Sequence, residues 1–286
     1  MDYHIVGPKK VRKNEIMKII LSRKGFDTQY GGQPSPILPD GTLLSLPIPA
    51  KEEKLKFSEL TFNGKSYLDI IHELKPSTKI NEKYTCHLDP DLRIDATPRK
   101  SKWRPLFGQT KSAQGHLSKN GVSKGDLFLF FGTFRATEYV KGKIRYIKGT
   151  KDLHLIFGYL QIGNIYSDYN SFNPDIKFHP HAQERFANDK NNCIYEASER
   201  FSLVDTLEGA GCLNFHEDLV LTKKGFTKSK WNLPSFFKEV NISYHSKKSF
   251  TSEYFQSAAK GQEFIIEESE KVSDWARKLI INGTKA

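Results

Sequence analysis

"GVSKGDLFLFFGTFRATEYVKGKIRYIKGTKDLHLIFGYLQIGNIY", residues 121–166, contains two long apolar runs separated by a charged segment with glycines. The runs DLFLFFGTF and LHLIFGYLQIGNIY are rich in aromatic and β-branched residues, which favour strands. Gly125-Asp126 predicts a tight turn before the first run, and Lys141-Gly142 predicts a hairpin after it. Gly132 and Gly158, inside the runs, indicate bulges or close backbone approaches. We expect three or four consecutive strands here.

Shorter elements are expected on both sides of this segment. Apolar runs predict further strands, and apolar residues at helical spacing predict helices, the first of them capped by Ser66. Because strands and helices are mixed without regular βα alternation, we expect an α+β fold. Its core would be a mostly antiparallel sheet or a partly closed barrel, with peripheral helices and long irregular loops. The expected strands are 16–21, 217–222 and 262–268, and the expected helices are 66–74, 251–260 and 270–282.

The chain of 286 residues shows no break in composition strong enough to divide it. We therefore expect one domain over residues 16–286, preceded by a basic mobile arm at residues 1–15. No apolar run approaches the roughly 20 residues that span a bilayer, and the N-terminus is too polar for a secretory signal. The three cysteines form neither a CxxC pair nor an even disulfide set. These features predict a cytoplasmic protein without a membrane partner.

The charge is strongly positive, with 44 Lys and Arg against 33 Asp and Glu, a formal net charge of +11. An excess of this size is typical of proteins that meet phosphates, so we expect a nucleotide or nucleic acid as partner. The alternative is a solvated basic face without a partner. Local basic clusters occur at Lys9–Lys13, Arg99–Arg104, Lys141–Lys151 and Lys223–Lys230.

A long irregular segment, residues 21–49, follows the first expected strand and is rich in Gly and Pro. Structureless connections of this length are usually functional or disordered. Arg23 and Lys24 at the strand's exit are candidates for binding phosphate, and Asp27 and Asp40 are candidates for holding a sugar or a base. The alternative is a rigid surface loop whose Arg and Asp pair with each other.

Two histidine-containing motifs are candidate metal or acid/base sites. In "HLDPDLR", His87, Asp89 and Asp91 occupy alternate positions, which face the same way in an extended chain. Imidazole and carboxylate ligands together suit Mg, Mn, Fe or Zn, although Asp-Pro-Asp is also ordinary turn chemistry. In "HPH", His179 and His181 have the same spacing but need ligands from elsewhere to complete a site. A divalent metal is the cofactor these motifs would take.

Other polar residues are candidates for binding or catalysis. Gln109 and His116 could read a base edge, and Trp231 beside Lys230 could stack on a base, although each could equally be ordinary packing or loop decoration. Arg135 ends a strand at an expected barrel rim, where it must be paired. Glu263 enters a strand and could act as a general base. The catalytic candidates are therefore Asp27, Asp40, His87, Asp89, Asp91 and Glu263, and the phosphate- or nucleotide-binding candidates are Arg23, Lys24, Gln109, His116, Arg135, Lys230 and Trp231.

No P-loop, GxGxxG, GxSxG or HExxH motif is present, so the standard enzyme classes are not indicated. An ordered series of blocks nevertheless resembles one family. The blocks are "LSRKGFDTQYGGQPSPILPDGTLLSLPIP", "CHLDPDLR", "FGQ…AQGHL…GVSKGDLFLFFGTFR", "LHLIFGYLQIG", "HPH" and "GQEF". Together they resemble the nucleotide modification associated domain 3 family, and residues 121–166 alone resemble PUA-like barrels, in which "GD" precedes a central strand.

The family resemblance implies an association with DNA base-modification and phage-conflict systems, with action on nucleotides or modified bases and with partner proteins of such a system. Three hypotheses follow. The first is an enzyme that modifies a nucleotide or a nucleic-acid base; the second is a non-catalytic reader of modified bases; the third is a structural partner in a larger modification complex. Clustered carboxylates favour the enzyme. We expect Arg23, the His87 segment and Glu263 to meet in one phosphate-accepting hollow.

Overall fold

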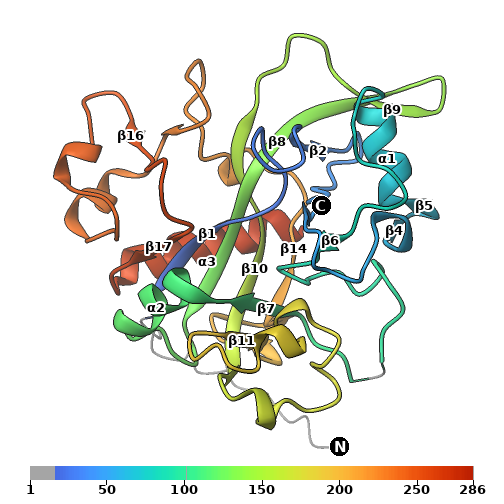
Figure 1. Ribbon diagram of the computed structural model, residues 1–286. Helices are drawn as coiled ribbons and strands as arrows, with labels where there is room; N and C mark the ends of the chain where they lie inside the picture. The colour runs from blue at the N-terminus through green and yellow to red at the C-terminus, as the bar shows by residue number, and fades with distance from the viewer. Residues whose placement is uncertain (1–16, 101, 286) are drawn as a thin grey trace, which may run out of the picture.

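The computed structural model describes residues 17–100 and 102–285. The sheet at its centre is built on β8 (Leu127–Val140) and β10 (Leu153–Tyr166), which run side by side through the middle of the molecule (Figure 1). The strand order is β17-β1-β8-β10-β11-β7, with β2 and β9 on β8 and β14 on β10. The other strands of this sheet are β1 (Ile19–Arg23), β2 (Ser35–Ile37), β7 (Leu106–Gln109), β9 (Lys143–Tyr146), β11 (Cys193–Ala197), β14 (Ala210–Cys212) and β17 (Glu263–Ile266).

This sheet confirms the α+β class. Most neighbours are antiparallel, but β1 and β2 both pair with β8 in parallel, so the sheet is mixed. The strand order has two ends, β17 and β7, and the sheet is open; the barrel alternative, and with it the PUA-like core, is not what the described chain forms. The prediction of an arm at residues 1–15 lies outside the described residues, and the prediction of one domain over residues 16–286 stays a prediction.

The glycine-based expectations for the central hairpin are confirmed. Lys141 and Gly142 both adopt positive φ, 51° and 76°, as a tight two-residue hairpin turn requires. A Cβ at Gly132 would lie 2.6 Å from the carbonyl oxygen of Lys24, so only glycine lets these strands approach. At Gly158 the register with β8 shifts, which is the expected bulge.

Three helices lie around the sheet: α1 (Tyr67–Leu74), α2 (Lys111–Lys119) and α3 (Glu270–Thr284). The predicted cap of α1 is confirmed, because Ser66 Oγ accepts from the Asp69 N–H at 3.0 Å. The described helices include none that is long and apolar enough to cross a membrane. Four two-stranded sheets complete the fold: β3 (Ile48–Pro49) with β6 (Cys86–His87), β4 (Thr61–Phe62) with β5 (Lys65–Ser66), β12 (Arg200–Phe201) with β13 (Val204–Glu208), and β15 (Lys230–Trp231) with β16 (Phe255–Gln256).

Two local predictions were wrong. Residues 217–222 are not a strand: a short 3₁₀ turn, Glu217–Leu219, begins there, and only Val220 bridges to β10. Residues 251–260 are not a helix, because the Thr251 hydroxyl accepts from the N–H groups of Glu253 and Tyr254 and closes a turn instead. Residues 221 and 222 instead donate their N–H groups to the His154 carbonyl of β10.

Candidate metal centre

The free edge of β7 carries the site. Asp91 bridges to Leu106 through two backbone hydrogen bonds, which lays the chain before it along this edge. The carboxylate of Asp89 accepts from the Gly108 N–H at 2.7 Å and so takes an edge donor that no strand uses. His87, the last residue of β6, precedes Asp89 by two residues in the chain. The segment that the sequence marked by alternate polar residues is thus fixed to the sheet by main-chain bonds.

A third side chain comes from a distant short 3₁₀ helix, Pro180–Ala182. His181 lies directly against Gly108: a Cβ on Gly108 would come within 2.2 Å of the His181 ring. Any other residue at this position of β7 would push the imidazole away from the edge. Glycine at 108 therefore makes room for the histidine, and this close approach had no visible signal in the sequence.

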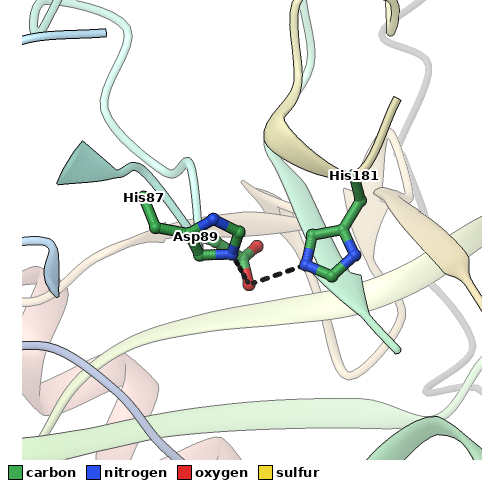
Figure 2. Close-up of side chains that lie close together, drawn as sticks. All are labelled: His87, Asp89 and His181. Carbon is green, nitrogen blue, oxygen red and sulfur yellow. Dashed lines mark ion pairs between the residues drawn. The ribbon is translucent and has the colours of Figure 1, made fainter. Parts of the chain in front are cut away.

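His87, Asp89 and His181 converge on one point. The Nε2 atoms of His87 and His181 lie 3.8 and 4.0 Å from the same oxygen, Oδ2 of Asp89 (Figure 2). One ligand atom from each of the three lies within 4.8 Å of the others. Metal–ligand bonds of about 2.1 Å place tetrahedral ligands about 3.4 Å apart. Small side-chain movements would therefore bring all three atoms onto one cation.

Hydrogen bonds on the far side of each imidazole decide which nitrogen faces this point. His87 Nδ1 donates to Glu53 Oε1 at 2.7 Å. His181 Nδ1 donates to Asn192 Oδ1 at 2.8 Å, and the Asn192 amide nitrogen donates back to the His181 carbonyl, which fixes the orientation of the amide. Neutral imidazoles held in this way turn their Nε2 lone pairs toward Asp89. Metal-binding histidines are commonly oriented by such partners.

Burial supports the same protonation pattern. Burial lowers the pKa of His181 to about 3, so its imidazole is neutral at pH 7. For Asp89, burial alone would raise the pKa, but His179, whose Nε2 proton faces the carboxylate, outweighs it and is the main cause that holds the pKa well below its usual range. A neutral imidazole and an ionised carboxylate are the forms that bind a metal.

His179 lies beside Asp89 but is not one of the three converging residues. Its Nδ1 accepts from the His181 N–H at 3.3 Å, which leaves the proton on Nε2. That nitrogen lies 3.3 Å from the other Asp89 oxygen, Oδ1, without hydrogen-bond geometry. The side chain is fully buried. His179 is therefore placed to orient Asp89, whereas the sequence suggested it as a ligand equal to His181.

Asp91 does not join the three. Its carboxylate is held by both terminal nitrogens of Arg99, at 2.5 and 2.6 Å. Burial raises the pKa of Asp91 despite this partner. Asp91 shares the alternate spacing with His87 and Asp89, but its bonds to Arg99 keep its carboxylate out of the converging set.

The remaining candidates are held by structural partners. Arg23 donates to the carbonyls of Ala258 and Ala259, and its guanidinium lies 5.7 Å from the Phe131 and Phe264 rings. Lys24 pairs with the buried Glu263 at 3.0 Å, and Gln109 donates to the same Glu263 oxygen at 2.7 Å. Asp27 and Asp40 each accept backbone N–H groups within their own turns, Arg135 pairs with Asp152, His116 contacts Ser243, Lys230 lies over the Tyr254 ring, and Trp231 is buried with its indole N–H on His154.

A groove of about 530 Å³ opens beside the three residues. His87, Glu53, Lys111, Arg185 and Phe186 are among the residues that line it. Neither Arg23 nor Glu263 lines this groove, so the single hollow expected to join both of them to the His87 segment is not what the structure has. A substrate can instead approach His87 from this groove.

Glu53, Asn192 and the packing glycine at 108 are the parts of the site that sequence reasoning missed. Glu53 lies in the run KEEK, which looks like a solvated charged segment. In the structure it is 7% exposed, and its carboxylate also accepts from Gln183 at 2.6 Å and from Arg185. Asn192 lies in the polar run NDKNN, where nothing distinguished it from its neighbours.

Comparison with known proteins gives one match. The sequence model of a family described as Nucleotide modification associated domain 3 matches residues 18–267, which include every residue of the converging set and its partners. A search of curated proteins found no match, and neither did a search of solved structures.

Proposed function

This chain belongs to the nucleotide modification associated domain 3 family, and from that membership we propose that it is a metal-dependent enzyme that modifies a nucleotide or a base in nucleic acid. The observation that carries the proposal is the convergence of His87, Asp89 and His181 on one point beside an open groove. The setting in DNA-modification or phage-conflict systems, with partner proteins, belongs to the same proposal.

The donor set suits a transition metal. Two imidazole nitrogens and one carboxylate oxygen are ligands for Zn²⁺ or Fe²⁺, and three protein ligands leave positions open for water or substrate. A metal held there would polarise a phosphoryl or carbonyl oxygen, or lower the pKa of a bound water. The protein residues supply the rest: Glu53 and Asn192 hold the two histidines in their metal-binding tautomers, and His179 faces the second oxygen of Asp89.

Without a cation this arrangement is electrostatically incomplete. Three acceptors face one another at 3.8 and 4.0 Å, and the imidazole protons lie on the outer sides of the rings. A divalent cation would bind all three acceptor atoms at once.

The test begins with metal binding. The purified protein is stripped with a chelator and titrated with Zn²⁺, Fe²⁺ and Mn²⁺ by calorimetry, alongside Asp89→Asn and the matched control Asp40→Asn, whose carboxylate only closes an exposed turn. We expect one metal per chain in the wild type and in Asp40→Asn, and an affinity at least about 100-fold weaker in Asp89→Asn, since the variant loses a direct ligand.

Activity is then sought by incubating the loaded protein with nucleotides and with DNA and measuring nucleoside masses after digestion. We expect a mass change that requires the metal and is absent in Asp89→Asn. A wild type that binds no metal, or a mass change that survives both stripping and Asp89→Asn, would overturn the proposal. Binding of modified DNA with no metal and no mass change would identify a reader instead.

A further inference from the structure

The basic segment from Tyr139 to Lys151 is not part of the site described above. It contains Lys141, Lys143, Arg145, Lys148 and Lys151 and no acidic residue, so it carries five positive charges against a net charge of +11 for the chain. All five cationic residues are exposed. Within residues 17–100 and 102–285, none of them forms an ion pair. We call residues 139–151 the basic arm.

The arm is held rigidly to the fold. Side chains alternate along β9, so Lys143 and Arg145 face outward while Ile144 and Tyr146 face α1 and the core. The Ile144 N–H donates to Glu73 of α1 at 3.0 Å, and the Tyr146 hydroxyl donates to the Pro34 carbonyl at 2.5 Å. Figure 1 shows β9 at the edge of the molecule, beside α1. Its cations are therefore displayed on a fixed strand and hairpin turn and do not belong to a loose tail.

In the other basic clusters of the described chain, several cations are held by partners. Arg99 is bound to Asp91 and lies 4.3 Å from the Trp103 ring. Lys223 donates to the Glu253 carbonyl, and Lys230 lies 4.6 Å from the Tyr254 ring. The arm differs because five exposed cations without an ion pair follow one another within residues 139–151.

A groove of about 780 Å³ runs along the arm, between β9 and α1. Lys143 and Arg145 line one side, and Lys65, Asp69, His72 and Glu73 are among the residues on the other. The four residues of β9 extend over about 13 Å. The phosphates of one free nucleotide cannot reach cations spread along such a strand and around its turn, whereas the repeated phosphates of a polymer can.

We propose that the basic arm binds the phosphate backbone of a nucleic-acid polymer. The inference rests on the proposed function and names its substrate class: a base within a polymer, not a free nucleotide. Arginine and lysine on a strand contact phosphates without reading sequence, so the arm would supply affinity and leave base choice to the groove beside His87.

The experiment compares two variants of equal charge. One replaces the five cations of the arm with Gln, and the other replaces five exposed, unpaired lysines elsewhere in the described chain, Lys54, Lys119, Lys124, Lys224 and Lys278, with Gln. Each lowers the formal net charge from +11 by five. Binding of labelled single-stranded DNA, duplex DNA and RNA is measured by anisotropy across a salt series, with a nucleoside monophosphate as competitor.

We expect the arm variant to bind at least about 10-fold more weakly than the control variant. When all five contacts are lost, the salt slope should fall by up to about 3.5 for single strands and about 4.5 for duplex DNA. The monophosphate should not compete. Equal weakening in the two variants, displacement by the monophosphate, or no binding of any polymer by the wild type would overturn the inference. Metal titration of the arm variant separates the two proposals, because loss of the arm should leave metal affinity unchanged.

Discussion

Two buried polar clusters lie on opposite faces of β7, and each accommodates a buried carboxylate in a different way. Gln109 faces the first, where it donates to Glu263 beside Lys24. Gly108, the preceding residue, faces the second, where His181 and Asp89 contact it. Successive residues of a strand face opposite sides, so this short edge strand separates the two.

The first cluster contains its own cation. Lys24 pairs with Glu263 at 3.0 Å, and its ammonium lies 4.5 Å from the centre of the Phe107 ring. Charges within this cluster therefore cancel. In the second cluster Asp89 faces two imidazole lone pairs, and no cationic side chain of the described chain lies among them. The difference teaches that burial of ionisable groups alone does not mark a metal site; the convergence of imidazole and carboxylate ligand atoms on one point does.

The largest expected effect comes from breaking the first cluster. Lys24→Met leaves Glu263 buried without its cation, which should reduce the free energy of unfolding by about 3 to 5 kcal/mol. Adding Glu263→Gln should restore much of this loss, because the amide can still accept from Gln109. Urea unfolding measures both variants. A Lys24→Met protein as stable as the wild type would contradict the view that this cluster is a structural ion pair.

A smaller effect is expected from a partner of the second cluster. Glu53→Gln keeps the size of the side chain but weakens its hold on the His87 Nδ1 proton, so metal affinity should fall about 10- to 100-fold. Glu52→Gln is the matched control, because Glu52 also contacts Arg185 but is exposed and does not reach His87. Calorimetric titration measures both. Equal affinities in the two variants would show that Glu53 does not position the histidine.

The fold was predictable where one pattern dominated a long segment. The aromatic runs of β8 and β10 and the amphipathic spacing of α1 and α3 are strong signals, and all four elements are present. Residues 217–222 and 251–260 are short and carry weaker patterns, so individual hydrogen bonds decide their structure. The parallel pairing of β1 with β8 was also beyond the sequence, because register across distant strands depends on packing.

The site was predictable only in part for a similar reason. Alternation along the chain brought His87 and Asp89 together as expected, and the structure adds His181 from a segment far along the chain. Asp91 shared the pattern, but its carboxylate is paired with Arg99 and does not join the set. Glu53 acts through contacts across the fold, and no spacing in the sequence encodes those.

The smallest expected effect is a pH dependence of stability that comes from His154, a buried histidine outside both clusters. Burial lowers its pKa to about 3, as it does for His181, and its Nδ1 accepts from the Trp231 indole N–H at 3.1 Å. An unfolded histidine has a pKa near 6.5, so between about pH 6.5 and 3 the unfolded state binds more protons than the folded one. Stability therefore rises with pH across this window and falls on acidification.

His154 alone should lower the free energy of unfolding by about 1.4 kcal/mol for each pH unit below about 6.5. His154→Gln keeps an acceptor for Trp231 but cannot titrate, so it should lose this share of the slope when the free energy of unfolding is measured from pH 7 down to pH 5. Metal should leave the His154 share unchanged, since this histidine already has its donor in Trp231 and lies outside the metal-binding set. A slope that is the same in wild type and His154→Gln would mean that His154 is protonated in the folded protein, and the contrast between a satisfied and an unsatisfied buried histidine would then fail.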